Sequence, residues 1–447
     1  MITRIEATRY RCFEKLDVEL GDFRVLVGAN GSGKTTLLDI PVLLGDLLRV
    51  RTIDEAFMSV RDGRAPRAAS LSELLFQGQG ENFILGVEAK LPEHVTRDLG
   101  GDMVESAART HLRYELRLQV FNKTELQVQN EYLFAFPEGH APARAGADLT
   151  APRLHAEAQQ TRPVRQPRGK HGLVKPQPPS LPPPWRLILS REYGDDAEYI
   201  GEKQRKGARS SVKLAPSQLA LARVQFENQS DFPAARWFFD LLVEDAVFFD
   251  PDWNSLRMAS PPGLPKTKVL GSAKNAPWLA LELQRTDPER FALWKTHVRL
   301  ALPQVSDISV HEREDDHHAY FRVRYGDRYD VPSSGLSDGT LRILVMTLLA
   351  YIAKPPRFLV TEEPENGIHP QATEIVLQSL SSIYDSQVIV SSHSPVVLAS
   401  MNLEQILAAR ISESGAAQVV AGTQHPRLVD WKGEVSLPTL FATGVLG

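Results

Sequence analysis

One stretch near the amino terminus constrains this chain more than any other. An apolar run at residues 25–27 breaks into a glycine-rich loop at residues 28–35, which fits the pattern G-x-x-x-x-G-K-[ST], and residues 35–48 then carry apolar side chains at helical spacing. The glycines of such a loop let backbone N–H groups wrap phosphate groups at the N-terminus of the next helix. We therefore expect a buried strand, a phosphate-binding loop and a helix that is kinked at Pro41.

The chemistry expected of this loop is the binding of ATP together with a magnesium ion. Lys34 would reach the β- and γ-phosphates, and Thr35 would offer its hydroxyl to Mg²⁺. The alternative is a glycine-rich turn without a ligand. The residues that we expect to contact the nucleotide here are Asn30, Gly31, Ser32, Gly33, Lys34, Thr35 and Thr36.

Composition narrows the class of protein. A chain of 447 residues is long for a single core, and its 42% apolar and 24% charged residues are ordinary for a globular protein. A net charge of −4 gives no global attraction to nucleic acid or to an anionic membrane. The single cysteine, Cys12, excludes an internal disulfide framework and favours a reducing compartment; we interpret it as a small buried apolar residue rather than a reactive thiol.

Targeting and membrane signals are not found in the sequence. Met1 leads directly into an alternating stretch, and the most apolar candidate helix, at residues 341–353, is too short to span a bilayer and contains Arg342. We therefore expect a cytoplasmic protein without a membrane partner.

Four segments are predicted from the patterning. Residues 1–80 contain two or three strands and the phosphate-binding loop, and residues 81–214 show the period-two alternation of an antiparallel β meander. Residues 215–304 have helical periodicity, over residues 218–247 and 276–302, and residues 305–447 return to strands that alternate with helices. The runs of alternation in the meander are residues 83–89, 111–121, 126–136, 185–190 and 197–200.

The meander is interrupted at residues 137–184 by a stretch of Pro, Arg, Gln and Ala. With few large apolar groups it cannot offset its ordering entropy by burial, so we expect a flexible excursion. A solvated loop is the first interpretation of its basic residues, and a DNA, RNA or partner contact is the alternative, because clustered positive charge favours polyanions. The basic residues in and after it are Arg162, Arg165, Arg168, Lys170, Lys175, Lys203, Arg205, Lys206 and Arg209.

Two further polar stretches have a functional and a structural interpretation. Residues 71–80 contain a short helical segment followed by glycines, where Gln77 or Gln79 could sense Mg²⁺ or the attacking water; an ordinary helix end is the alternative. Residues 311–318 are rich in His, Glu and Asp, but their spacing does not match a metal site, so we predict the tip of a hairpin between two strands.

An acidic strand end follows much later in the chain. Residues 357–363 form an apolar strand that ends in the adjacent carboxylates Glu362 and Glu363, whose side chains point to opposite sides and therefore need different roles. A buried strand that ends in a solvated acidic turn is the alternative.

Two other stretches flank this strand in the sequence. Residues 334–340 read Ser-Gly-Leu-Ser-Asp-Gly-Thr at the start of an apolar helix, where Ser337 and the side-chain-free Gly339 can offer an anion-binding helix N-terminus or form a plain N-cap. Residues 387–395 form a strand that ends in Ser-Ser-His-Ser-Pro and carries His393.

Along the chain the order is the glycine-rich loop, the segment 334–340, the acidic strand end and the strand that carries His393. In this order the motifs resemble those of ABC-type ATPases of the SMC, RecF and OLD-like branch, over roughly residues 1–80 and 305–405. The resemblance implies that Glu362 helps to hold Mg²⁺ through water, that Glu363 activates the attacking water and that His393 contacts the γ-phosphate. Ser337 and Gly339 would complete the nucleotide site of a second subunit. The family more often has Asp where Glu362 stands, so the metal geometry here departs from its pattern.

The implied fold class is α/β: an ABC-type P-loop ATPase head, with a mixed sheet and flanking helices, an antiparallel β insertion and a helical subdomain. Sustained heptads are not found between Phe83 and Leu302, which excludes a long coiled-coil arm. The segment after His393 is too short for the TOPRIM nuclease domain of long-tailed OLD proteins. The resemblance therefore implies a compact ATPase that acts beside a separately encoded effector, like those of bacterial anti-phage defence operons.

The expected function is Mg²⁺-dependent ATP hydrolysis, coupled to the formation of a homodimer or higher oligomer with shared nucleotide sites. Such a cycle would control an effector, a nuclease or a toxin, or a nucleic acid, in genome maintenance or defence. One alternative is a nucleotide-gated sensor or scaffold with little turnover. The ATPase subunit of a transporter is a weaker alternative, because the large insertion does not suit it.

Overall fold

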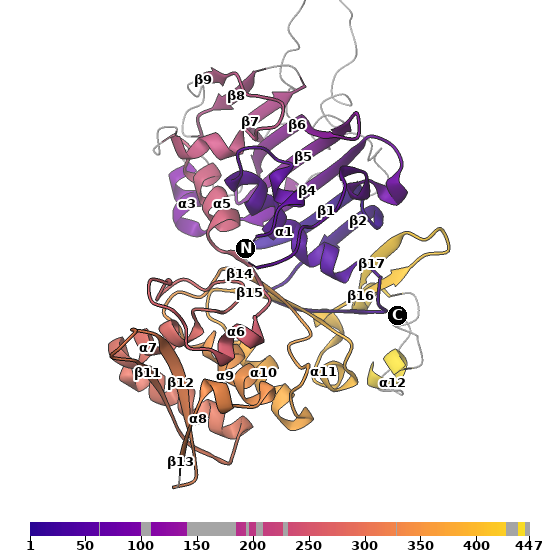
Figure 1. The fold of residues 1–447 in the computed structure, drawn as a ribbon. Coiled ribbons are helices and arrows are strands. Elements are labelled where there is room, and N and C mark those ends of the chain that lie inside the picture. The colour runs from indigo at the N-terminus through magenta and orange to yellow at the C-terminus, as the bar shows by residue number, and fades with distance from the viewer. Residues whose placement is uncertain are drawn as a thin grey trace, which may run out of the picture. The chain divides into compact units, whose positions relative to one another are not determined.

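The computed structural model of the chain consists of two compact units (Figure 1). The first contains Met1–Glu19, Leu43–Arg61 and Ala65–Val243, and the second contains Leu20–Val42, Asp62–Arg64 and Glu244–Gly447. The four-segment division of the sequence remains a prediction. The residues that the structure describes are 1–61, 63–99, 109–140, 185–193, 196–202, 209–226, 231–327, 329–425 and 437–442.

The first unit contains an eight-stranded antiparallel sheet in the order β2-β1-β4-β5-β6-β7-β8-β9. The predicted meander strands are confirmed, and the first two strands of the chain also join this sheet, because β1 pairs with both β2 and β4. The strands are β1 (Ile2–Tyr10), β2 (Phe13–Glu19), β4 (Asn82–Lys90), β5 (His111–Phe121), β6 (Glu125–Phe136), β7 (Arg186–Glu192), β8 (Ala197–Ile200) and β9 (Arg209–Val212).

A buried ionic cluster fixes the register of the central strands of this sheet. The Arg113 guanidinium donates to the carboxylates of Glu6, Glu88 and Glu115, each at 2.6 Å. The pKa of Arg113 is raised well above its usual range, because the attraction of these carboxylates exceeds the effect of burial. Since an unpaired buried charge is strongly destabilising, a shifted pairing of β1, β4 and β5 is disfavoured.

The second unit contains a six-stranded sheet in the order β10-β14-β15-β3-β16-β17. The first five strands are parallel and β17 is antiparallel, so the carboxyl ends of β10, β14, β15, β3 and β16 lie at one edge. The strands are β3 (Phe23–Gly28), β10 (Ala246–Phe249), β14 (Phe358–Glu362), β15 (Gln387–Ser392), β16 (Ile406–Ile411) and β17 (Ala417–Ala421).

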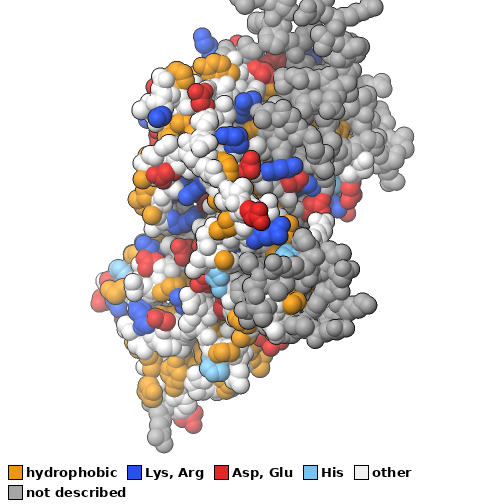
Figure 2. All heavy atoms as spheres, turned by 90° about the vertical axis from the view of Figure 1, so that its right-hand side faces the viewer, with side chains coloured by type: hydrophobic (Ala, Val, Ile, Leu, Met, Phe, Trp, Pro, Cys, Tyr) orange, Lys and Arg blue, Asp and Glu red, His pale blue; other side chains and the backbone are white. Residues whose placement is uncertain are grey.

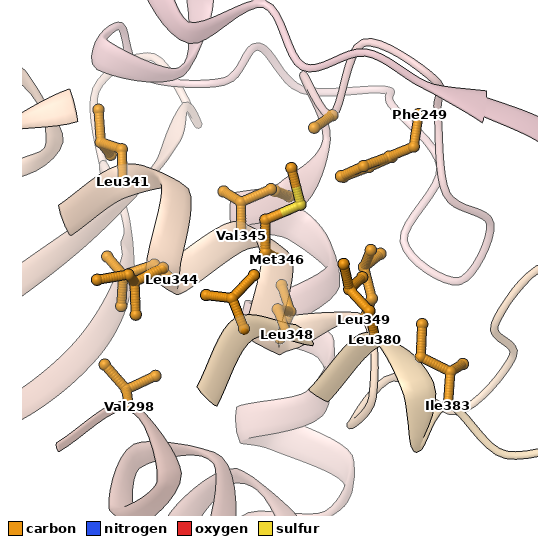
Figure 3. Close-up of a cluster of buried hydrophobic side chains, with 14 of the residues drawn as sticks. Phe249, Val298, Leu341, Leu344, Val345, Met346, Leu348, Leu349, Leu380 and Ile383 are labelled. Atoms are coloured by element: carbon orange, nitrogen blue, oxygen red, sulfur yellow. The ribbon is translucent and has the colours of Figure 1, made fainter. Parts of the chain in front are cut away.

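The core of the second unit is built around helix α9 (Asp338–Leu348). This helix packs against α8 (Pro288–Ala301) and α10 (Pro370–Ser381), and Figure 3 shows Leu344 and Val345 among side chains from the surrounding elements. Because apolar side chains on most of its circumference are buried, α9 is anchored by the core along its length. The other helices of this unit are α6 (Trp253–Arg257), α7 (Ala276–Thr286), α11 (Pro395–Ala399) and α12 (Leu437–Ala442).

A separate three-stranded sheet precedes α9. It consists of β11 (Val305–Glu312), β12 (Ala319–Tyr325) and β13 (Tyr329–Pro332), paired antiparallel. The turn between β11 and β12 contains the acidic and histidine-rich residues 313–318, so the hairpin prediction for this stretch is confirmed.

One local prediction differs from the structure. Residues 218–247 were expected to be helical throughout, but α5 (Pro233–Val243) ends before the edge strand β10. The run Ala246–Phe249 is buried on both faces and pairs with β14, so tertiary pairing overrides the helical pattern. The short helical segment predicted before the glycines is confirmed as two 3₁₀ turns, Leu71–Leu74 and Phe76–Gly78. Among the described residues, the remaining α-helices are α1 (Lys34–Arg49), which contains Pro41, α2 (Glu55–Met58) and α3 (Glu93–Leu99).

Among the described residues, every helix is too short or too polar to cross a bilayer. On the face that Figure 2 presents, Lys and Arg side chains of the described residues are interspersed with Asp and Glu. This mixture agrees with the small net charge of the sequence.

A close contact between strands makes a first prediction at Gly28. A Cβ atom at this position would lie 2.0 Å from the carbonyl oxygen of Ala409 on the neighbouring strand β16. We expect Gly28→Ala to lower the free energy of unfolding by about 3 kcal/mol, because backbone on both sides resists the shift. Gly31→Ala is the control: nothing lies within 4 Å of its Cβ position, and its positive φ of 78° predicts a loss of only about 1 kcal/mol. Equal losses in denaturant unfolding would contradict the contact.

Candidate active site

The sequence motifs meet at the carboxyl edge of the six-stranded sheet. In the strand register Glu362 at the end of β14 lies beside Ser391, and Ser392 at the end of β15 lies beside Val27, just before the phosphate-binding loop. Ligand sites of open parallel sheets lie outside this edge. The fold therefore brings the loop, the acidic strand end and the histidine to one place.

The phosphate-binding loop has the backbone shape that its glycines predict. Gly31 and Gly33 adopt positive φ angles of 78° and 88°. Ser32 is buried, and its Oγ lies 2.9 Å from the place where a Cβ of Gly28 would stand, so this side chain points under the loop. The backbone N–H of Ser32 donates to the carbonyl oxygen of Ala29 at 3.3 Å, so a phosphate that binds this N–H has to replace that acceptor.

The exposed residues of the loop segment are Ala29, Asn30, Gly31 and Thr35, while Thr36 is half-buried. The open residues can meet a ligand without a change in the fold. Their predicted contacts with nucleotide remain predictions.

Lys34 closes the loop from inside. Its Nζ donates to the carbonyl oxygens of Gly28 at 2.8 Å and of Ala29 at 2.9 Å. Burial lowers the pKa of Lys34, and the nearby carboxylates of Glu362 and Glu363 oppose that shift. The ammonium group is thus held among carbonyl oxygens, which a phosphate oxygen can replace as acceptors.

Thr35 and Glu362 form the contact that best fits a magnesium ion. The Thr35 Oγ1 donates to Glu362 Oε1 at 2.5 Å, although the two residues lie 327 positions apart. A hydroxyl and a carboxylate side by side are the oxygen ligands that Mg²⁺ takes in nucleotide sites, where it keeps several waters. The residues present therefore fit the implied ion.

Two charged residues near Glu362, Asp250 and Arg64, were not predicted from the sequence. Asp250 directly follows β10, and Glu362 is the last residue of the paired strand β14. The negative charge of Asp250 helps to raise the pKa of Glu362. Arg64 opposes that rise in pKa, while it pairs with Asp39 at 3.0 Å and stacks on Phe248 at 3.7 Å. The apolar run before Asp250 is compatible with a helix or a strand, so this carboxylate had no clear signal in the sequence.

Glu363 is held in a rare backbone conformation. Its φ is 43°, a value that costs energy for a residue with a side chain and is often found at functional sites. Its Oε2 accepts a hydrogen bond from Asn366 Nδ2 at 3.2 Å, and its Oε1 lies 3.6 Å from Nε2 of His393. The two residues with predicted roles in hydrolysis are therefore neighbours.

His393 is half-buried beside charged groups of both signs. Burial lowers the pKa of His393, the Lys34 ammonium lowers it further, and the Glu363 carboxylate opposes both. A lowered pKa favours the neutral imidazole near neutral pH, in which one ring nitrogen donates and the other accepts.

A second carboxylate, Glu365, supports the strand end that carries His393. The Ser392 Oγ donates to Glu365 Oε1, and the backbone N–H of Ser394 donates to Ser392 Oγ at 3.0 Å. Burial raises the pKa of Glu365, and the Ser392 hydroxyl opposes the rise. This connection joins the turn after β14 to the end of β15, and the spacing of residues along the chain gave no signal for it.

The segment around Ser337 forms the N-terminus of α9. Ser337 Oγ accepts a hydrogen bond from the N–H of Thr340 at 3.1 Å, so the N-cap interpretation of this serine is confirmed. A Cβ at Gly339 would lie 2.8 Å from the carbonyl oxygen of Gly367, so close packing within the chain requires a glycine here. Contact of Ser337 and Gly339 with a second subunit's nucleotide remains a prediction.

The other predicted site residues belong to the first unit or lie outside the described residues. Gln77 belongs to the first unit, in a 3₁₀ turn where its φ is 52°, and its predicted role as a metal sensor remains a prediction. The basic residues in 162–175 and 203–206 lie outside the described residues. Arg209, the last of them, is exposed at the start of β9.

The electrostatics of Glu362 make a second prediction. Burial by the surrounding protein is the main cause of its raised pKa, and Asp250 adds to it. Glu362 therefore gains a proton at a higher pH than an ordinary glutamate, and we expect Mg²⁺ affinity in the presence of ADP to fall earlier on acidification. Asp250→Asn should move this loss of affinity to lower pH, because it removes a negative charge that raises the pKa of Glu362.

Calorimetric titration of Mg²⁺ between about pH 5 and pH 8 would measure this effect. Glu362→Gln is the control, since its remaining pH dependence reports the titration of the nucleotide. If Mg²⁺ affinity falls at the same pH in Asp250→Asn as in the wild type, Asp250 does not influence the protonation of Glu362.

Comparisons with known proteins agree with these observations. Residues 237–399 match the family model AAA_21, described as "AAA domain, putative AbiEii toxin, Type IV TA system". The match contains the segment around Ser337, the acidic strand end and His393. A 69-residue segment is 39% identical to an OLD nuclease of Thermus scotoductus (strain ATCC 700910 / SA-01). The aligned segment covers 14% of this chain and only 13% of the nuclease.

Among solved structures, similarity is found to heads of Smc proteins. One is the Smc head bound to the C-winged helix domain of ScpA, with 14% identity, a TM-score of 0.48 and coverage of 94% of this chain and 97% of that chain. Another is the Smc head domain with an extended coiled coil, bound to the C-terminal domain of ScpA from Pyrococcus furiosus, with 13% identity, a TM-score of 0.45 and coverage of 100% and 98%.

The fold class is α/β and P-loop ATPase-like, as the strand order and the glycine loop show. The AAA-domain match and the OLD-like segment are local, and both agree with the branch that the motifs indicated. The chain therefore combines a P-loop ATPase-like α/β fold with local sequence similarity to an AAA domain and to an OLD nuclease.

Proposed function

We propose that this protein hydrolyses ATP with Mg²⁺ and uses the cycle to open and close a dimer. The observation that carries the proposal is the contact between Thr35 and Glu362, which joins the phosphate-binding loop to the acidic strand end beside Glu363 and His393. A loop without a ligand would not need a metal-type carboxylate against its threonine hydroxyl.

Each residue has a separate task in this proposal. Lys34 exchanges its carbonyl acceptors for β- and γ-phosphate oxygens, and Glu363 accepts the proton of the attacking water. His393 donates to the γ-phosphate from its neutral ring. Bound by Thr35 and, through water, by Glu362, Mg²⁺ would neutralise charge on the phosphates.

The second subunit completes the site. In the proposed homodimer or higher oligomer, Ser337 and Gly339 of one copy face the nucleotide held by Lys34 of the other. The N-terminus of α9 suits this task, because its dipole and its first amide groups favour an anion. ATP then links the two copies and hydrolysis releases them.

We further propose that this cycle controls a separately encoded effector, a nuclease or a toxin, in defence or genome maintenance. Support comes from the local similarity to an OLD nuclease and to an AAA domain whose description includes a toxin system. The basic residues of the excursion, such as Arg165 and Lys170, are proposed to contact DNA or RNA if nucleic acid is the trigger.

A nucleotide-gated sensor or scaffold is the second candidate. The contacts of Glu363 favour it, because one carboxylate oxygen accepts from Asn366 and the other faces His393. A base engaged in this way must be released before it can activate water, so turnover would be slow until a partner or a second subunit rearranges it.

The test is the association state of the purified protein, measured by light scattering with and without ATP and Mg²⁺, together with phosphate release. We expect ATP to increase the molar mass. Ser337→Arg should prevent that increase, because it places a bulky charge at the shared face, while Lys34 still binds ATP to each monomer. Turnover should therefore rise with concentration in the wild type only.

Two results would contradict the proposal. A constant mass that ignores both ATP and Ser337→Arg would favour the scaffold. Phosphate release that is equal with and without Mg²⁺ would remove the role given to Thr35 and Glu362.

A further inference from the structure

A single arginine holds the segment around Ser337 from outside α9. Arg257, the last residue of α6, donates from Nη1 to the carbonyl oxygen of Leu336 at 2.6 Å and from Nη2 to the Asp338 carboxylate at 2.5 Å. The two acceptors stand on either side of Ser337. One guanidinium therefore spans the residue that is proposed to face the second subunit's nucleotide.

Helix α6 is itself fixed at the carboxyl edge of the sheet. It follows β10 directly, and Asp252 caps it by accepting a hydrogen bond from the N–H of Ser255 at 3.1 Å. The N–H groups of Asp250 and Asp252 donate to the carbonyl oxygens of Gly271 and Ser272, each at 2.9 Å. Arg257 thus acts from a short helix whose start follows β10 and is hydrogen-bonded to the turn at residues 271–272.

The rest of the segment is also held within the chain. Ser333 Oγ accepts from the N–H of Phe321 at 2.9 Å and donates to its carbonyl oxygen at 3.2 Å, and the side chain of Leu336 is buried. The first backbone bond of α9 runs from the N–H of Leu341 to the carbonyl oxygen of Ser337. The amides of Asp338 and Gly339 precede it, so they stay available for an anion.

The contact of Arg257 with Asp338 is not explained by stability. The two side chains are 31% and 63% exposed, and an ion pair that is this exposed contributes little to folding. The buried side chains of α9 already anchor the helix (Figure 3). What the guanidinium adds is the orientation of residues 336–338, where the chain enters the helix.

We propose that Arg257 is a positioning residue, which orients Ser337 and Gly339 toward the nucleotide of the second subunit. The inference rests on the shared site of the proposed function. Arg257 itself does not touch nucleotide; it acts through Leu336 and Asp338. The planar guanidinium of an arginine can donate to two acceptors at fixed angles. A lysine would keep the positive charge but could hold only one of the two acceptors.

The experiment mixes two inactive variants. Arg257→Ala should bind a fluorescent ATP analogue like the wild type but lose about 10- to 100-fold in turnover, because the segment is misplaced. Lys34→Ala should lack nucleotide but keep an intact segment. In a heterodimer the nucleotide of the Arg257→Ala copy meets the intact segment of the Lys34→Ala copy, so mixing should restore turnover.

Controls separate this inference from the proposed function. A mixture of Ser337→Arg with Lys34→Ala should also regain activity if sites are shared. Arg285→Ala removes an exposed ion pair with Glu312 on the β11 hairpin and should behave like the wild type. Arg257→Lys should show an intermediate turnover. If Arg257→Ala does not fold, as judged by the lack of a cooperative thermal transition, Arg257→Lys takes its place in the mixing experiment.

The outcomes are distinct. If the Ser337→Arg mixture recovers and the Arg257→Ala mixture does not, or if Arg257→Ala alone keeps full turnover, the positioning role is overturned. If neither mixture recovers, the shared site is wrong and this inference falls with it. Recovery in both mixtures, with unchanged nucleotide affinity of Arg257→Ala, is the expected result.

Discussion

Glu363→Gln is expected to bind ATP and to hydrolyse it about 100- to 10,000-fold more slowly than the wild type, the usual effect of losing a general base. The amide has the size of the carboxylate but cannot accept the proton of the attacking water. Since ATP would then persist between two subunits, the closed dimer should accumulate. Phosphate release and molar mass, measured on the same sample with ATP and Mg²⁺, check both parts of this expectation.

The control for this variant is Asn366→Ala. It removes the side-chain amide that donates to Glu363 Oε2 but leaves the base in place, so hydrolysis should continue. Hydrolysis at the wild-type rate by Glu363→Gln would show that another group activates water. Slow hydrolysis without accumulation of a dimer would retain Glu363 as the base and separate chemistry from assembly.

Lys34→Ala is expected to weaken ATP binding by about 100-fold or more, which corresponds to roughly 3 kcal/mol. No other cation of the loop can replace the ammonium at the phosphates, because the loop segment 28–36 contains a single basic residue. The fold should be retained, since Lys34 is a buried cation whose pKa is lowered by burial and whose acceptors are loop carbonyls.

Thermal unfolding measures this effect without an activity assay. A ligand that binds only the folded state raises the melting temperature, so ATP should stabilise the wild type and leave Lys34→Ala unchanged. Lys34→Arg keeps the charge with a different shape and should give a smaller shift than the wild type. An equal ATP-induced shift in Lys34→Ala would refute the assignment of this loop.

Short-range patterning predicted much of the fold. The runs at residues 83–89 and 111–121 alternate with a period of two and form β4 and β5 with only small differences at their ends. The glycine loop was visible because its residues are consecutive. In both cases the signal is local: apolar and polar residues alternate along a strand, and glycine gives the backbone freedom. The polar residues Glu88, Arg113 and Glu115 of these strands are nevertheless buried, because they form the ionic cluster.

Contacts between distant residues could not be predicted in this way. Ser392 meets Glu365 across 27 positions, and Arg257 meets Leu336 across 79, and neither pair forms a periodic pattern. The strand β10 was missed because four apolar residues after a helix fit helix and strand equally well. Its pairing with β14 decided between them.

Strand β3 is synthesised long before the two strands that flank it in the sheet. This strand lies between β15 and β16, and Gln387 Nε2 reaches the carbonyl oxygen of Gly21 at 2.8 Å across 366 positions of the sequence. On the ribosome the apolar residues Val25 and Val27 therefore emerge long before either neighbouring strand exists. Until then both edges of β3 are unpaired, which exposes the nascent chain to aggregation and makes it a candidate for chaperone binding. The phosphate-binding loop is framed only once β15 and β16 have been made, so a nascent chain should gain affinity for ATP late in its synthesis.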